Sequence, residues 1–191
     1  MNTTPMGALL RQAQTRPTRT AFIFQGETWT YGRLAAEAEH LACGLAARGV
    51  KPGDRIALHM MNRPEMIVAY YACFRLGAVA APLRTAFKPA ELAPILQRLK
   101  PALYIGEAGL YENVAPVEGS ILASDKRVIV GQTAAESGLQ SWEMLFGGVT
   151  AMRCRLRQLC MNPWCCPTHP EQPASPNSSF TRRQPYPKPW T

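Results

Sequence analysis

The carboxyl-terminal part of the sequence holds the residues that come nearest to a metal-binding group. Four cysteines and a histidine lie within one short segment: Cys154, Cys160, Cys165, Cys166 and His169. Thiolates and imidazoles are the ligands of structural zinc sites, in which paired Cys-x₂₋₄-Cys spacings are usual. The spacings in this segment do not repeat such a pair. The pattern therefore favours cysteines that are present by accident, and we predict no metal site.

Outside that segment, two histidines are the candidates for acid–base chemistry. His40 falls on the flank of a predicted amphipathic helix, and His59 falls at the end of a predicted strand. Neither has a nucleophile or a carboxylate at motif spacing, so we predict structural or surface roles for both. Asp54 follows a glycine and is predicted to cap a turn. Three methionines are predicted to fill the core: Met60, Met61 and Met66. We therefore predict no catalytic, cofactor-binding or metal-binding residue in this chain.

Charge and composition divide the chain into two parts. It has 191 residues, and 21 lysines and arginines against 13 aspartates and glutamates give a net charge of +8. Residues 1–150 carry +3 of this excess, whereas residues 151–191 carry +5 together with eight of the 17 prolines and four of the six cysteines. We predict a folded segment over residues 1–150. The Pro/Cys/Arg-rich residues 151–191 are predicted to be disordered, because they cannot bury enough surface to offset the entropy of ordering.

Two binding roles for residues 151–191 stay open beside disorder. Aromatic and basic side chains near the end suit single-stranded nucleic acid, through stacking and charge: Phe180, Arg182, Arg183, Tyr186 and Trp190. Residues 185–189, PYPKP, suit a partner that binds extended polyproline segments. The proline density favours disorder without a partner, so nucleic-acid binding is not our prediction. The sequence leaves the oligomeric state open.

Hydropathy argues against a membrane protein. No apolar run approaches the roughly 20 residues that span a bilayer, and the most apolar stretch, residues 66–74, is short and contains two tyrosines. The first 20 residues hold no apolar stretch of signal-peptide length. We therefore expect no membrane span and a cytoplasmic location, where the cysteines would be reduced thiols.

Periodicity predicts alternating strands and helices over residues 1–150. A helix is expected over residues 6–14, a hairpin of residues 21–24 and 28–31 around Gly26, and a helix over residues 30–48 capped by Thr30. In this last helix one apolar stripe recurs at helical spacing: Leu34, Ala38, Leu41 and Leu45. Gly49 is expected to end the helix. A buried strand is expected over residues 55–60.

The same pattern continues toward residue 130. Asn62 is predicted to cap a helix that runs to residue 76 and that, being apolar nearly all round, is expected to lie between layers. Strands are expected over residues 78–81, 102–105 and 127–130. Pro89 can start a further helix, in which Pro94 predicts a kink or a late start. This order predicts an α/β fold with a largely parallel sheet.

Six segments, in order and at the expected spacing, resemble the adenylate-forming (AMP-binding) enzyme superfamily. They are WTYGRL at residues 29–34, GVKPGDRIA at 49–57, NRPE at 62–65, FRLGAVAAPL at 74–83, KPAEL at 88–92 and ALYI at 102–105. The resemblance covers roughly residues 10–150, and within the superfamily it is nearest to acyl-CoA synthetases (fatty-acid–CoA ligases). It implies the partial N-terminal subdomain of such an enzyme.

The resemblance also implies a reaction and its cofactors. Such enzymes activate a small-molecule carboxylic acid with ATP and Mg²⁺ to an acyl-adenylate, and then transfer the acyl group to a thiol, usually that of CoA. Their phosphate loop, which reads like YTSGTTGxPK, is expected soon after residue 150, where glycine backbone N–H groups and a lysine would hold phosphate. This chain contains no such segment. None of these cofactors is therefore expected to bind this chain well.

A shifted reading frame accounts for the missing loop. When the third base of each codon is read with the first two bases of the next, each junction permits only a few residues. The ten junctions from Pro167/Thr168 to Pro176/Asn177 permit, in order, Tyr, Thr, Ser, Gly, Thr, Thr, Gly, Gln, Pro and Lys. We therefore expect residues from about Met152 onward to be an out-of-frame translation, and the chain to be truncated.

The sequence thus predicts a truncated acyl-CoA ligase that is inactive on its own. The resemblance implies an acid–thiol ligase, but whether this chain acts as an enzyme stays open, because the catalytic motifs are missing. One alternative is a non-catalytic binding protein that uses its basic carboxyl-terminal segment. Another is a folding-defective fragment whose unfinished parallel sheet exposes a strand edge.

Overall fold

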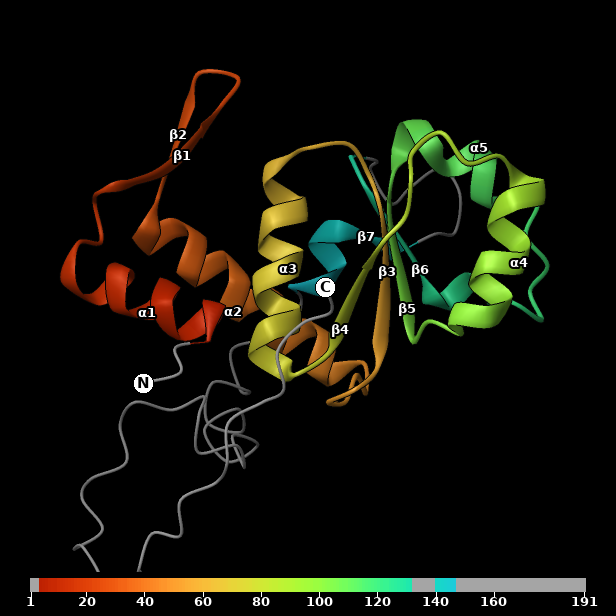
Figure 1. The fold of residues 1–191 in the computed structure, drawn as a ribbon, viewed down its shortest axis with the longest axis horizontal. Helices are drawn as coiled ribbons and strands as arrows, with labels where there is room; N and C mark the ends of the chain where they lie inside the picture. The colour runs from red at the N-terminus through yellow and green to blue at the C-terminus, as the bar shows by residue number, and fades with distance from the viewer. Residues whose placement is uncertain (1–3, 132–139, 147–191) are drawn as a thin grey trace, which may run out of the picture.

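The structure is a computed structural model that describes residues 4–131 and 140–146. The described part contains one parallel sheet, one separate hairpin and the helices around them (Figure 1). In chain order the elements are α1 (Pro5–Thr15), β1 (Thr20–Phe24), β2 (Glu27–Thr30), α2 (Tyr31–Ala47), β3 (Arg55–His59), α3 (Pro64–Leu76), β4 (Val79–Pro82), α4 (Pro89–Leu99), β5 (Leu103–Glu107), η1 (Ala108–Leu110), α5 (Tyr111–Val114), η2 (Ser124–Lys126), β6 (Arg127–Val130), β7 (Gln140–Ser141) and η3 (Trp142–Leu145).

The five-stranded sheet confirms the predicted fold class. Its strand order is β4-β3-β5-β6-β7, and every neighbouring pair is parallel. Parallel neighbours need crossover connections, and helices lie in those from β3 to β4, from β4 to β5 and from β5 to β6. Helices α2 and α3 cover one face, and α4 and α5 cover the other (Figure 1). Within the described residues, no helix is both long enough and apolar enough to cross a membrane.

Helix α2 forms where its sequence pattern predicts. The Thr30 hydroxyl accepts the Arg33 N–H at 3.2 Å, which satisfies one of the unpaired donors at the helix start. The predicted stripe is buried: Leu34, Ala38, Leu41 and Leu45. Gly49 has φ +81°, a left-handed conformation that glycine adopts without strain, so the chain turns sharply after the helix.

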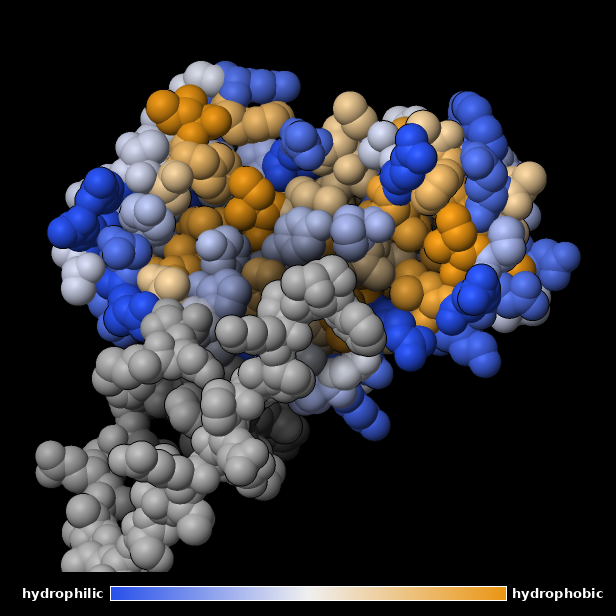
Figure 2. All heavy atoms as spheres, in the orientation of Figure 1, coloured by the Kyte–Doolittle hydropathy of each residue, from blue (hydrophilic) through white to orange (hydrophobic). Residues whose placement is uncertain are grey.

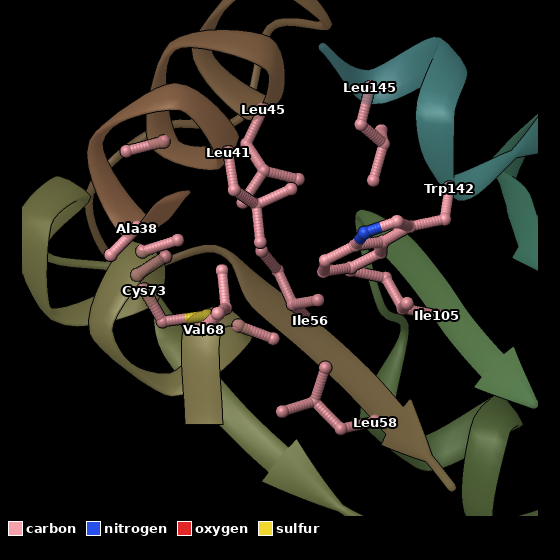
Figure 3. Packing of buried hydrophobic residues seen from close by; sticks show 14 of the residues in the cluster. Ala38, Leu41, Leu45, Ile56, Leu58, Val68, Cys73, Ile105, Trp142 and Leu145 are labelled. Carbon is pink, nitrogen blue, oxygen red and sulfur yellow. The ribbon is translucent and has the colours of Figure 1, made fainter. Parts of the chain in front are cut away.

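The core consists of two apolar clusters, one on each face of the sheet. On the α2/α3 face, side chains from three separate parts of the chain converge (Figure 3). They include Leu41 and Leu45 from α2, Ile56 from β3, and Trp142 and Leu145 from the end of the described chain. The second cluster packs beneath α4 and includes Leu92, Leu96 and Tyr104. Burial on both faces explains why the strands read as continuous apolar runs.

Three predictions about the middle of the chain need correction. The cap of α3 is Arg63 rather than Asn62, because Pro64 holds the first helical position and its fixed φ sets the boundary there. Helix α3 is not enclosed all round, since Phe74 is 40% exposed. Helix α4 begins at Pro89 and continues through Pro94, so the late start does not occur, whereas the kink stays a prediction.

The edge strand β4 ends in a proline for a structural reason. The N–H groups of Val79 and Leu83 both donate to the β3 side, to the carbonyls of Asp54 and Leu58, each at 2.8 Å. Backbone groups alternate along a strand, so Pro82 faces away from β3. Its missing N–H therefore leaves the paired side of the ladder intact, and it removes a donor from the free edge.

A close backbone contact holds η3 against α2. A Cβ atom added to Gly44 would overlap the Leu145 carbonyl, so the two elements lie closer than any other residue would permit. Two hydrogen bonds from Arg48 of α2 reinforce this contact: its guanidinium donates to the Gln140 side chain at 3.1 Å and to the Met144 carbonyl at 2.9 Å. Leu145 and Trp142 are thereby brought into the core.

The buried cation Arg127 organises the connection between β5 and β6. It is 5% exposed, and its guanidinium makes five hydrogen bonds, all to backbone carbonyls. The acceptors are the carbonyls of Val114, Ala115, Val117 and Leu122. Val114 is the last residue of α5, and the other three carbonyls lie in the irregular segment before β6, so a single side chain supplies donors where no sheet ladder does.

Substitution of Gly44 by alanine is expected to destabilise the protein by about 2 kcal/mol, because the new methyl group forces η3 away from α2. Gly109→Ala is the matched control: a Cβ there meets nothing within 4 Å, so we expect a change below about 0.5 kcal/mol. The midpoint of urea unfolding, followed by circular dichroism, measures both. Equal effects of the two substitutions would contradict the close contact.

Arg127→Met is expected to cost about 3 kcal/mol, because it leaves several buried carbonyls without a donor. The exposed Arg98 of α4 provides the comparison, and Arg98→Met is expected to change stability by less than about 0.5 kcal/mol. Thermal unfolding of the two variants gives the difference. A stable Arg127→Met protein would show that the β5–β6 connection does not need the guanidinium.

Candidate functional site

The strand order marks one place in the sheet where a ligand site is expected. From β3 the chain forms β4 on one side, and it then crosses back to form β5 on the other side. In open α/β sheets, ligands bind outside the carboxyl ends of the strands, where the direction of winding reverses. That place lies between the ends of β3 and β5, at His59 and Glu107.

One cation and two carboxylates join the loop after β3 to the end of β5. The Arg63 guanidinium donates two hydrogen bonds to Glu65, at 2.8 and 3.0 Å, and lies 3.2 Å from a Glu107 carboxylate oxygen. Glu107 also accepts the Met61 backbone N–H at 3.0 Å. These three charged side chains are largely buried. Glu107 therefore ties β5 to the segment that leads into α3.

The charges in this cluster compensate one another. The hydrogen bond to Glu65 raises the pKa of the Arg63 guanidinium above its ordinary value, and Glu107 adds to the effect, while burial opposes it. Arg63 thus stays charged, and its positive field is cancelled by two carboxylates. A phosphate at this position would have to compete with both of them, so the cluster as it stands does not suit a nucleotide phosphate.

A buried aromatic pair lies beside this cluster. His59 is fully buried, and its Nδ1 lies 2.8 Å from the Tyr104 hydroxyl, which joins neighbouring strands β3 and β5. Among the described residues, its Nε2 makes no hydrogen bond. A Cβ on Gly106 would overlap the Tyr104 ring, so glycine makes room for this pair.

Burial keeps both members of the pair neutral. It lowers the pKa of His59, with a smaller opposing effect from the Arg84 backbone, and it raises the pKa of Tyr104 well above its ordinary range. A neutral imidazole that shares a hydrogen bond with a neutral phenol supports the structural role predicted for His59. His40, by contrast, is half-buried on α2.

The remaining predictions from the sequence have mixed outcomes. The Asp54 carboxylate accepts the Lys51 N–H at 2.8 Å, which confirms its role in a turn. Met60 is in the core as predicted, and Met66 packs against it. Met61 is 57% exposed, so its prediction was wrong: β3 ends before it, and its backbone turns toward Glu107.

The predicted accidental cysteines and His169 lie outside the described residues. Within the described residues, no group of three or more histidines, cysteines or acidic side chains could hold a metal ion. Sequence reasoning missed Glu107, because the strand was expected to end at residue 105. Residues 62–65 were predicted only to start a helix. The spacing of Arg63 and Glu65 just after a predicted strand was the signal in the sequence for a charged pair at the strand end.

Comparison with known proteins gives one consistent family. The sequence profile of the family described as AMP-binding enzyme matches residues 9–178, which includes part of the segment 151–191. The 2-succinylbenzoate–CoA ligase of Bacillus pumilus (strain SAFR-032) is 32% identical over 133 residues, which are 70% of this chain and 26% of that protein.

Solved structures agree with this result. A protein described as a long-chain-fatty-acid CoA ligase from Rhodopseudomonas palustris CGA009 is 30% identical with a TM-score of 0.69, over 74% of this chain and 36% of that chain. The O-succinylbenzoate coenzyme A synthetase of Bacillus subtilis, solved with AMP, is 32% identical with a TM-score of 0.51, over 58% and 29%. This chain spans less than two fifths of the length of the curated relatives it matches.

Protonation of His59 is expected to make the protein less stable in acid. Because burial lowers its pKa in the folded state, only the unfolded chain takes up the proton near the ordinary pKa of 6.5. Stability is therefore complete above that pH and falls below it, by up to about 1.4 kcal/mol per pH unit. Urea unfolding at pH 7.5 and 5.5 measures the change.

His59→Gln should reduce this pH dependence relative to the wild type. The comparison rests on the slope of stability against pH, so a general loss of stability in the variant does not affect it. An unchanged slope in His59→Gln would show that another group is responsible.

Proposed function

We propose, because the chain belongs to the AMP-binding enzyme family, that it is the N-terminal part of an ATP-dependent acyl-CoA ligase. The reaction joins a carboxylate to the AMP part of ATP, which releases pyrophosphate, and a thiol of CoA then displaces AMP to give a thioester. The observation that carries this proposal is the family match over residues 9–178, together with relatives described as CoA ligases.

The described residues provide the scaffold of such an enzyme rather than its chemistry. They present the carboxyl edge of a parallel sheet, but Arg63 there is already paired with Glu65 and Glu107. The sequence contains no phosphate loop that could hold ATP. Among the described residues, no group of histidines, cysteines or acidic side chains could hold Mg²⁺. We therefore propose that this chain alone catalyses neither half of the reaction.

The alternative reading frame supports a longer original enzyme. Ten consecutive codon junctions, from Pro167/Thr168 to Pro176/Asn177, permit YTSGTTGQPK. Such a segment would supply backbone N–H groups, hydroxyls and a lysine for the phosphates. We propose that residues from about Met152 onward replace this loop through a frame change, so that residues 1–150 form the native part.

The proposed substrate is a small-molecule carboxylic acid. The relatives are described as ligases of 2-succinylbenzoate and of medium-chain and long-chain fatty acids. An aromatic or a fatty acid is therefore the proposed class for the intact enzyme. The cytoplasm, with its ATP and CoA, is the proposed location.

Restoring the frame is expected to restore activity. Sequencing the gene around codon 152 should show codons that spell the loop when the frame is shifted by one base. The frame-restored enzyme should catalyse ATP–pyrophosphate exchange that depends on an added carboxylic acid, whereas the 191-residue chain should show none. A panel of aromatic and fatty acids tests both proteins.

Each opposite result has its own meaning. Exchange by the 191-residue chain would show that residues 151–191 do not abolish activity. No exchange by the frame-restored enzyme with any acid would contradict the proposed ligase. Codons that cannot spell the loop would contradict the frame change.

A further inference from the structure

One nitrogen of the buried His59 ring lacks a hydrogen bond. The side chain is fully buried, and its Nδ1 lies 2.8 Å from the Tyr104 hydroxyl, but no group of the described residues bonds its Nε2. Leaving a buried polar atom unpaired costs free energy, so nearly all such atoms in native proteins have a partner. The unused nitrogen therefore points to a second contact of this side chain.

The segment that joins β4 to α4, residues 83–88, passes beside His59. The Leu83 N–H donates at 2.8 Å to the carbonyl of Leu58, the residue before His59, and Arg84 follows it in the chain. A backbone group of Arg84 raises the pKa of His59, although burial lowers it more. A group that raises the pKa of an imidazole accepts a hydrogen bond from its charged form. This group is therefore the Arg84 carbonyl, and Nε2 is the nitrogen left to face it.

The acceptors around the ring determine which nitrogen carries the proton. If Nδ1 carried it, the Tyr104 hydroxyl would accept that proton and would have no acceptor for its own among the described residues. The Nε2 lone pair would also face a carbonyl lone pair. If Nε2 carries the proton, the Tyr104 hydroxyl donates to Nδ1, and the Nε2–H faces the Arg84 carbonyl. The second arrangement gives each of these groups a complementary partner.

The β4–α4 connection, residues 83–88, has few other hydrogen bonds to hold it. At its ends, Leu83 is bonded to β3, and the Lys88 N–H donates to the Glu91 carboxylate at 2.9 Å. Between these ends, the described residues supply the bond from the Phe87 N–H to the Arg84 carbonyl at 3.1 Å, which joins the connection only to itself. A carbonyl oxygen has two lone pairs, so this one can also accept the Nε2–H.

The connection carries an exposed cation at the carboxyl edge of the sheet. The Arg84 guanidinium lies 5.7 Å from the centre of the Phe87 ring, and no hydrogen bond or ion pair within the described residues engages it. The connection crosses the surface beyond the end of β4, where Figure 2 shows hydrophilic side chains. The Arg63 cation, by contrast, is paired with two carboxylates. The backbone of the connection thus determines where a cation without a carboxylate partner lies.

We propose that His59 is a positioning residue whose Nε2–H donates to the Arg84 carbonyl, directly or through one water molecule, and ties the β4–α4 connection to the sheet. A continuous chain of hydrogen bonds then runs from Tyr104 on β5 through His59 on β3 to the backbone that carries the Arg84 side chain. This role does not depend on the proposed ligase activity, because all of its residues belong to the described part of the chain.

The position of the proton is measured on the unmodified 191-residue chain. Labelling the histidines with nitrogen-15 and recording a long-range proton–nitrogen correlation at pH 7.5 distinguishes a protonated ring nitrogen from one with a free lone pair. We expect a neutral His59 that is protonated at Nε2 and not at Nδ1. The spectrum of His59→Gln identifies its signals by their loss. A proton on Nδ1 would overturn the proposal.

Two substitutions separate the roles of the two ring nitrogens. A glutamine amide reaches the position of Nε2, whereas an asparagine amide, one methylene shorter, reaches only that of Nδ1. His59→Asn keeps a partner for Tyr104 and loses the contact with Arg84, so we expect the Phe87 amide to exchange with solvent about tenfold faster or more. His59→Gln is the matched variant, and it should change that rate by less than about threefold.

Exchange of the Leu41 amide in α2, on the opposite face of the sheet, is the control for a general loss of stability. The rate for Phe87 is therefore compared with that for Leu41 in each variant. Equal acceleration of Phe87 in the asparagine and glutamine variants, or acceleration in neither, would overturn the proposal. Should neither variant fold, the proton position in the unmodified chain still decides it.

Discussion

The position of β3 between β4 and β5 is the constraint on which the rest of the described structure depends. Crossovers between parallel strands are right-handed, so a chain that moves first to one side of β3 and then to the other must place the two crossover helices on opposite faces. Helices α3 and α4 accordingly cover different faces (Figure 1). This arrangement divides the core into two clusters and puts the point of reversal at the carboxyl ends of β3 and β5.

The polar contacts at that point join the two strands between which the winding reverses. The hydrogen bond between His59 and Tyr104 joins β3 to β5 within the sheet. Glu107 then joins the end of β5 to Met61 and Arg63 beyond the end of β3. Both connections bridge the pair of strands where the winding changes direction. We propose that ligand-binding groups for this edge come from polypeptide beyond the described residues, as the proposed loss of the phosphate loop implies.

Local sequence patterns predicted most helices and strands of the described residues, but they did not predict contacts between residues that are far apart in the sequence. The stripe that includes Leu41 and Leu45 defines α2, because helical periodicity depends only on neighbours in sequence. Met61 looked like core by composition, but β3 ends two residues before it, at His59, and Met61 is exposed. Nothing near Arg127 in the sequence shows that its guanidinium binds carbonyls up to 13 residues earlier. The closeness of Gly44 to Leu145 is equally invisible, since it joins residues far apart in the chain.

Five arginines of the described residues make contacts within the protein, so net charge alone does not show how many cations are free to bind a nucleic acid. Arg48 and Arg55 donate to backbone carbonyls at 2.9 and 2.7 Å. Arg127 is entirely engaged with carbonyls, and Arg63 and Arg75 pair with carboxylates. A nucleic-acid surface requires cations that are free to contact phosphates along one face. In the described part of the chain, these five positive charges instead hold elements together, so they are engaged in internal contacts rather than free to contact phosphates.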